Sequence, residues 1–188
     1  MKIKRILPAL SIILLIILTF TACDNEKKEQ GIYGSWAYIH DKETEIAVFK
    51  NNGKAKYQGK DYTFTSDDQF IELKDADGKI TKMRYLLNDK GMYLYQNSTY
   101  TYVDEGKSQN LVGKWLCKET NWSYIFSSGG AFKEDDIFQG RYIVDEENST
   151  FTLIYEGGQL EDTLCYYKLL DNKLEIEYPW QMVPTGSE

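Results

Sequence analysis

The chain has 188 residues, of which 29 are acidic and 22 basic, so that its formal net charge is −7. This length allows one domain or two small ones, and a hydrophobic content of 42% is enough for a core. The acidic balance argues against a nucleic-acid partner, because a phosphate-binding surface needs an excess of Lys and Arg. The single histidine excludes metal centres built from several histidines.

The first 22 residues predict a signal peptide. Lys2, Lys4 and Arg5 form a positive start, and residues 6–20 form an uncharged, mostly apolar run. A charged start, a short apolar stretch and small residues before a cleavage site are typical of secretion signals. The apolar run is shorter than the ~20 residues that a membrane-spanning helix needs.

Thr21-Ala22-Cys23 resembles the lipobox of bacterial lipoproteins, although Phe20 stands where that family usually has leucine. The resemblance implies that Cys23 is lipidated and becomes the first mature residue. The protein would then be extracytoplasmic and anchored to the bacterial cell membrane through Cys23, with residues 23–30 as a polar tether. Plain secretion and an uncleaved anchor are the alternatives. The mature chain would carry 19 basic and 29 acidic groups, a net charge of −10.

A Gly-x-Trp tripeptide occurs twice, as Gly34-Ser35-Trp36 and as Gly113-Lys114-Trp115, at an offset of 79 residues. Four further segments of the first half recur in the same order in the second. The matched pairs are 48–53 with 125–129, 59–62 with 140–142, 70–73 with 151–154, and 85–90 with 168–173. Ordered matches of this kind predict two copies of one module.

Within each copy, apolar and polar residues alternate with a period of two, as in 61–65 and 173–178. Such alternation, broken by turn pairs like Asn52-Gly53 and Asp77-Gly78, predicts antiparallel strands joined by hairpins. The expected fold class is therefore all-β, with two tandem small meander barrels, or alternatively one larger barrel closed by both repeats. The expected divisions are a signal peptide (1–22), a polar tether (23–30), a first repeat (31–103), a linker (104–110), a second repeat (111–178) and a C-terminal tail (179–188).

A Gly-x-Trp at the start of a β-meander resembles the opening of lipocalin-like proteins. Gly34, Trp36, Gly113 and Trp115 are the repeat signature that carries this resemblance. The pattern is similar to lipocalin-like repeat domains of small bacterial surface lipoproteins, over about residues 31–178. It implies that each tryptophan closes one end of a barrel, but each repeat has only about half of the length of a full lipocalin barrel.

Few residues indicate chemistry. Cys117 and Cys165 are candidates for a disulfide, with two buried free thiols as the alternative. His40 has no counterpart in the second repeat and is interpreted as a surface histidine. The acidic runs 134–136 and 145–147 are interpreted as solvated loops, so neither a metal nor another cofactor is expected. No nucleophile, base and orienting group occur together, so an enzyme is not expected.

Aromatic residues are abundant, with 15 tyrosines and four tryptophans. Trp122, Tyr124, Tyr166 and Trp180 are predicted to face a ligand, because exposed aromatic rings favour glycan, peptide and lipid contacts. The competing interpretation is that these rings fill strand faces. The expected function is a non-enzymatic binding or scaffold module with an unknown protein, glycan or small apolar ligand as partner. The alternative is a carrier of a lipid or small apolar ligand in a lipocalin-like cavity.

Overall fold

The computed structural model describes residues 31–158 and 160–186. The predicted signal peptide, the tether and Cys23 lie outside the described residues. Strands make up 61% of the described residues, which contain one 3₁₀ turn, Glu156–Gly158, and no α-helix. None of its helical segments is long and apolar enough to cross a membrane.

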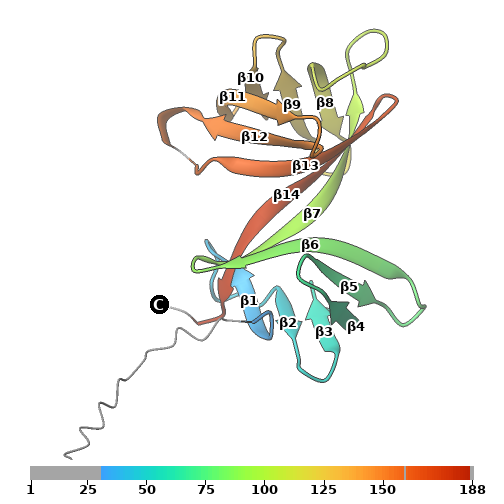
Figure 1. The fold of residues 1–188 in the computed structure, drawn as a ribbon, viewed down its shortest axis with the longest axis vertical. Coiled ribbons are helices and arrows are strands. Elements are labelled where there is room, and N and C mark those ends of the chain that lie inside the picture. The colour runs from blue at the N-terminus through green and yellow to red at the C-terminus, as the bar shows by residue number, and fades with distance from the viewer. Residues whose placement is uncertain (1–30, 159, 187–188) are drawn as a thin grey trace, which may run out of the picture.

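Fourteen strands follow one another along the chain, in two series of seven (Figure 1). The first series is β1 (Gly34–Tyr38), β2 (Ala47–Phe49), β3 (Lys54–Tyr57), β4 (Lys60–Ser66), β5 (Phe70–Lys74), β6 (Ile80–Asn88) and β7 (Gly91–Tyr102). The second is β8 (Gly113–Cys117), β9 (Trp122–Phe126), β10 (Ala131–Glu134), β11 (Phe138–Asp145), β12 (Thr150–Tyr155), β13 (Thr163–Leu170) and β14 (Lys173–Pro184). The all-β prediction is confirmed.

Alternation and turn chemistry explain these strands locally. In β3, Ala55 and Tyr57 are buried while the two lysines between and before them are exposed, as a half-buried strand requires. The hairpin that precedes β3 turns at Gly53, whose φ of 75° favours glycine. The same sequence pattern that predicts the strands therefore also fixes which side of each strand faces the core.

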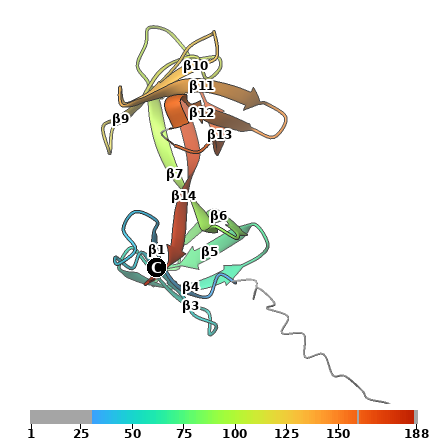
Figure 2. The ribbon, with the colours of Figure 1, turned by 90° about the vertical axis from the view of Figure 1, so that its left-hand side faces the viewer.

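All the strands belong to one antiparallel sheet that closes into a ring. Two 12-residue strands, β7 and β14, also pair with each other across the ring, from Thr101 opposite Lys173 to Met92 opposite Met182. This ladder is the ribbon that joins the upper and lower parts of the molecule in Figures 1 and 2. It divides the remaining strands into two sets, which we call the first lobe (β1–β6) and the second lobe (β8–β13).

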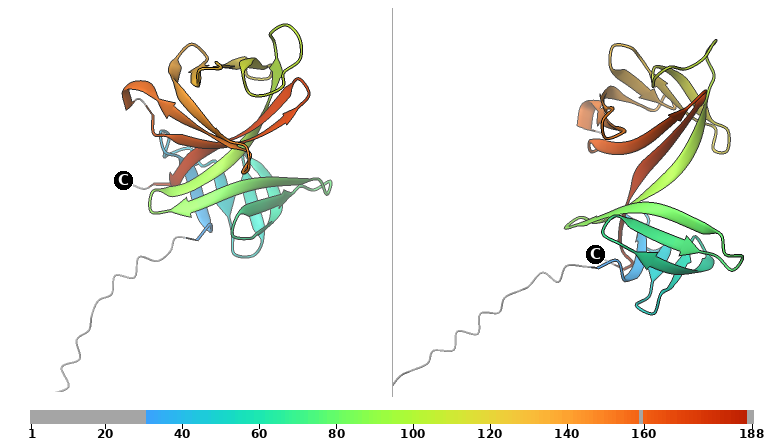
Figure 3. Two further views of the ribbon diagram at one scale, coloured as in Figure 1. Left: turned by 45° about the horizontal axis from the view of Figure 1, so that its top comes forward. Right: turned by 45° about the vertical axis from the view of Figure 1, so that its right-hand side comes forward.

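Each lobe has its own hydrophobic core. Trp36, Phe49 and Leu94 belong to the first core, and Trp115, Phe126 and Phe151 belong to the second. One half of the β7–β14 ladder contributes to each core, since Met92 and Met182 pack in the first while Leu174 and Ile176 pack in the second. The two lobes lie on either side of the ladder in the views of Figure 3.

The Gly-x-Trp segments adopt the same local structure in both lobes. Trp36 Nε1 donates to the Ile32 carbonyl at 2.8 Å, and Trp115 Nε1 donates to the Leu111 carbonyl at 2.7 Å. Both indoles are fully buried, and the preceding glycine has a φ of 132° at Gly34 and 125° at Gly113. The sequence repeat thus corresponds to a repeated structural unit at these positions.

The C-terminal end differs from the tail expected over residues 179–188. Strand β14 continues to Pro184, and its last residues pair with β1, with Trp36 opposite Pro184 and Tyr38 opposite Met182. Pro179 does not interrupt the ladder with β7, in which it lies opposite Tyr95. The physical reason is that β1 needs a second neighbour, and the end of the second repeat supplies it. The last strand of the second repeat therefore completes the first lobe.

Candidate binding pocket

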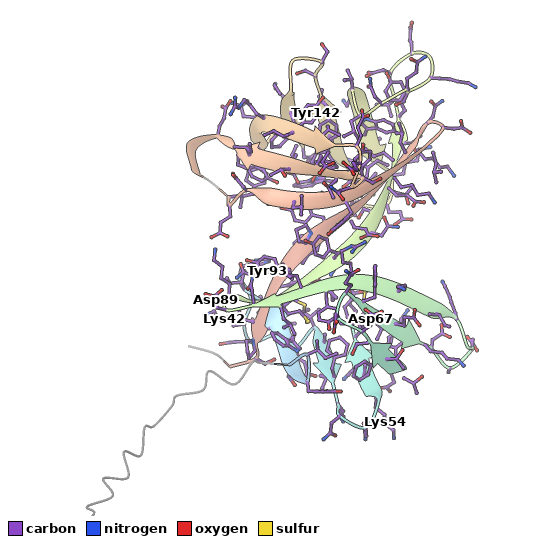
Figure 4. All side chains as sticks on the ribbon, viewed as in Figure 1. Lys42, Lys54, Asp67, Asp89, Tyr93 and Tyr142 are labelled. Atoms are coloured by element: carbon purple, nitrogen blue, oxygen red, sulfur yellow. The ribbon has the colours of Figure 1, made fainter. Side chains whose placement is uncertain are left out.

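A pocket of about 890 Å³ lies beside the β7–β14 ladder, where the two lobes face each other. Inward-facing residues of the second lobe form one end of the pocket, among them Tyr124 of β9 and Glu134 of β10. Leu86 of the first lobe and Tyr93 of β7 form the opposite rim; Figure 4 shows Tyr93 at the level where the lobes meet. A volume of this size is typical of small-molecule sites.

Glu134 is the central polar group of this pocket. Its side chain is only 6% exposed, although it lies on the pocket wall. Trp122 Nε1 and the Tyr124 hydroxyl donate to Glu134 Oε1 at 3.0 and 2.8 Å, and the Tyr155 hydroxyl donates to Oε2 at 2.9 Å. Three converging donors fit an ionised carboxylate, which only accepts hydrogen bonds.

Within the part of the chain that the structure describes, no cation pairs with this buried carboxylate. The ion pairs among the described residues join Lys82 to Glu72, Arg84 to Glu177 and Lys90 to Glu161, and none of them includes Glu134. Burying a charge without a counter-charge is costly, even when hydrogen bonds offset part of the cost. Glu134 is therefore an energetically costly feature that core packing alone does not require.

The tyrosines around Glu134 are held in the neutral state. Burial first, and the Glu134 carboxylate second, raise the pKa of Tyr155 and of Tyr124 well above the usual value. Burial also raises the pKa of Tyr100 and of Tyr178. The Tyr124 and Tyr155 hydroxyls consequently remain donors over the whole physiological pH range and keep the carboxylate fixed.

The rim adds further negative charge. Glu161 and Asp162 line it from the segment before β13, and the lining side chains include no lysine or arginine of the described chain. Lys90 reaches across from the β6–β7 hairpin and pairs with Glu161 at 2.8 Å, although both side chains are largely exposed. Such an exposed pair contributes little stability, but it spans the two lobes at the edge of the pocket.

Three of the four predicted ligand-facing aromatics meet in this pocket. Trp122, Tyr124 and Trp180 line it, and Trp180 packs against Tyr178 with ring centroids 5.6 Å apart. Tyr166 lies elsewhere: its ring contacts Tyr95 and lies 3.8 Å below the Arg84 guanidinium. Tyr166 thus belongs to an interlobe contact outside the pocket lining.

The two cysteines of the predicted disulfide are free thiols in the structure, and both are buried in the second core. Their strands β8 and β13 are not neighbours, since β7 and β14 lie between them in the sheet. Tyr100 belongs to the same buried cluster, and burial raises the pKa of the Cys165 thiol well above its usual value. The structure agrees with the alternative interpretation, two buried free thiols, and not with the disulfide.

The sequence reasoning missed the role of Glu134 by assigning it to a solvated acidic run. The signal was the alternation in Ala131-Phe132-Lys133-Glu134, where Phe132 and Glu134 both face inward. Tyr57 occupies the corresponding inward position at the end of β3 in the first lobe. His40, interpreted as a surface residue, is exposed and stacks on Tyr38 at the pocket rim.

A second pocket, of about 850 Å³, lies on the outer side of the first lobe. It is lined by exposed residues that include Lys50, Lys54, Lys56 and Lys74, and it contains no buried charged group. Among residues 31–158 and 160–186, no three His, Cys, Asp or Glu side chains gather to hold a metal ion. The pocket between the lobes is consequently the stronger candidate site.

Comparison with protein-family models, with curated proteins and with solved structures gave no match for this chain. The function is therefore argued from the geometry of the pocket.

Proposed function

We propose that the protein is an extracytoplasmic lipoprotein, anchored through Cys23, that binds a small molecule in the pocket between its lobes and catalyses no reaction. The observation that carries the binding function is the pocket that ends on Glu134, a buried carboxylate held by three donors. The lipobox-like segment before Cys23 supports the anchor.

For the fold, we propose that each lobe is a small lipocalin-like barrel. The β7–β14 ladder supports this assignment because it gives each lobe a closing pair of strands, and two separate cores support it as well. The alternative is a single large barrel closed by both repeats. A ring whose two halves are each packed with side chains leaves little interior space for a common lumen, which favours two barrels.

Binding is favoured over a purely structural role because Glu134 does not serve packing. A well-packed apolar residue at a buried position is commonly as stable as a charged one or more stable. In the first lobe, Tyr57 fills the corresponding inward position without introducing a charge. Natural proteins retain costly buried charges mainly where a site needs them.

A carrier of a lipid or small apolar ligand is the second candidate. The aromatic pocket wall, which includes Phe138 and Trp180, favours it. The uncompensated carboxylate at the inner end opposes it, because an apolar ligand would leave that charge without a partner and remove it further from water.

The four tryptophans allow a direct test. In protein labelled with ¹⁵N-tryptophan, each indole N–H gives its own NMR signal; Trp122 and Trp180 line the pocket, whereas Trp36 and Trp115 lie in the two cores. Small aromatic probes (benzylamine, benzyl alcohol and benzoate) and dodecanoate are added to the labelled protein one at a time. Shifts confined to Trp122 and Trp180 with one of the small aromatic probes support the proposal. Shifts of the same two indoles with dodecanoate but with none of the small aromatic probes would favour the apolar carrier.

The anchor has its own test. We expect Cys23→Ser to move the full-length protein from the membrane fraction to the soluble extracytoplasmic fraction, with Cys117→Ser as the matched control that remains in the membrane fraction. Retention of the Cys23→Ser variant in the membrane would contradict the lipid anchor.

A further inference from the structure

We infer that the pocket binds a small organic cation, whose ammonium or guanidinium group lies against Glu134 while its body is enclosed by aromatic rings. This inference rests on the proposed binding function and names the chemical class of the ligand. It follows from charge, from hydrogen-bond capacity and from the chemistry of the pocket walls.

The charge of the pocket is the first argument. Its lining contains Glu134, Glu161 and Asp162 but no lysine or arginine of the described chain. Lys90 pairs with Glu161 at the rim, so Glu134 and Asp162 are the lining carboxylates without an ion pair among the described residues. Low-dielectric walls concentrate such a field, so that cations are enriched in the pocket and anions are repelled. A bound cation would also supply the counter-charge that Glu134 lacks among the described residues.

The hydrogen bonds of Glu134 give the second argument. A carboxylate has about four acceptor positions. Trp122 and Tyr124 occupy the two positions of Oε1, and Tyr155 occupies one position of Oε2. One acceptor position on Oε2 is left for a ligand N–H, and a charge-assisted bond of this kind is about twice as strong as a neutral one.

The aromatic lining is the third argument. Ring faces attract cations within about 6 Å of their centroids, and tryptophan is the strongest of them. The rings that line the same pocket as Glu134 include Tyr100, Trp122, Tyr124, Phe138, Tyr178 and Trp180. Hard metal ions prefer several carboxylate oxygens, whereas one carboxylate among aromatic rings suits an organic cation.

Three probes of nearly the same shape distinguish binding that depends on the charge of the ligand from binding through its apolar ring alone. Benzylamine is cationic at pH 7, benzyl alcohol is neutral and benzoate is anionic. We expect benzylamine to bind at least about tenfold more tightly than benzyl alcohol, as one cation–π contact and one charge-assisted bond together suggest. Benzoate should bind more weakly than either. Titrations followed at the Trp122 and Trp180 indole signals give the three dissociation constants.

Glu134→Gln tests whether the carboxylate is the cause. Glutamine keeps an oxygen for Trp122 and Tyr124, and the Tyr155 hydroxyl can accept from its amide, so the pocket should retain its shape. The preference for benzylamine over benzyl alcohol should fall to about threefold or less, while the affinity for benzyl alcohol stays within about twofold. Glu147→Gln, an exposed change of equal charge outside the pocket, should leave both affinities unchanged.

The outcomes distinguish this inference from the proposed function. Equal binding of benzylamine and benzyl alcohol at Trp122 and Trp180 would overturn the cationic ligand but leave the binding pocket in place. An unchanged preference in Glu134→Gln would overturn the role of the carboxylate. If no probe shifts either indole, both the cation and the pocket are contradicted. Should Glu134→Gln not fold, Trp180→Leu provides the second variant, in which benzylamine alone should lose about threefold or more in affinity.

Discussion

Met182 allows a sharp test of how the two repeats depend on each other. Its side chain is fully buried in the core of the first lobe, although it lies in β14, the last strand of the chain, which begins in the second repeat. Removing a buried methionine side chain costs about 2–5 kcal/mol, a large part of the ~5–15 kcal/mol that stabilises a typical domain. We therefore expect Met182→Ala to destabilise the first lobe.

Hydrogen exchange of the tryptophan indoles localises the effect. A loss of about 2 kcal/mol corresponds to about 30-fold faster exchange, and we expect at least this acceleration at Trp36. Ile176→Ala is the matched control, because Ile176 lies six residues earlier in β14 and packs in the second core with Trp115. This control should accelerate the exchange of Trp115. An exchange rate at Trp36 within twofold of the unsubstituted value in Met182→Ala would refute the shared-strand arrangement.

Three further predictions concern the second lobe and the ladder. Glu134→Ala should lower the free energy of unfolding by about 2–6 kcal/mol, because it leaves two buried tyrosine hydroxyls without an acceptor at ~1–3 kcal/mol each. Glu134→Gln should lower it much less. If urea unfolding showed equal losses of stability in the two variants, the donor network around Glu134 would be contradicted. Burial and the neighbouring Tyr166 raise the pKa of Tyr95 to about 12. The Tyr95 hydroxyl therefore ionises at lower pH in the unfolded state than in the folded state, and the free energy of unfolding should fall between pH 10 and 12. A constant unfolding midpoint over this range would be inconsistent with the burial of Tyr95. Cys117 and Cys165 are buried free thiols, so a thiol reagent should modify them only in denaturant, and rapid modification of the native protein would disprove their burial.

Local patterns predicted most of the fold because they depend on neighbours in the chain. Alternation in segments such as 61–65 and turn glycines such as Gly53 are decided by backbone geometry, and the structure has strands and hairpins there. The repeat signature at Trp36 and Trp115 corresponds to two equivalent indole hydrogen bonds. These features need no knowledge of distant contacts.

The partners of β14 could not be predicted from such patterns. The segment 179–184 contains two prolines, a pattern that predicts an unpaired C-terminal tail. Residues 182–184 of this segment nevertheless pair with β1, nearly 150 residues earlier in the sequence. This pairing depends on which strand is left without a neighbour when the first lobe forms. Long-range pairing of this kind has no local signature.

The site was only partly accessible from the sequence for the same reason. Trp122, Tyr124 and Trp180 could be selected because aromatic residues are abundant beyond the needs of a small core, but Tyr166 belongs to a different contact. Glu134 appeared as part of an exposed acidic run. Only its place in the strand alternation, and the three donors brought to it from β9 and β12, identify it as buried.

Filling the pocket tests the binding site most directly. Ser98 of β7 is half-buried and lines the pocket, whereas its neighbour Thr99 is exposed and does not. Benzylamine affinity should therefore be measured for Ser98→Tyr and Thr99→Tyr, with urea unfolding to show that both variants are folded. We predict a loss of at least about tenfold for Ser98→Tyr and no change for Thr99→Tyr. Unchanged affinity in a folded Ser98→Tyr variant would contradict binding between the lobes.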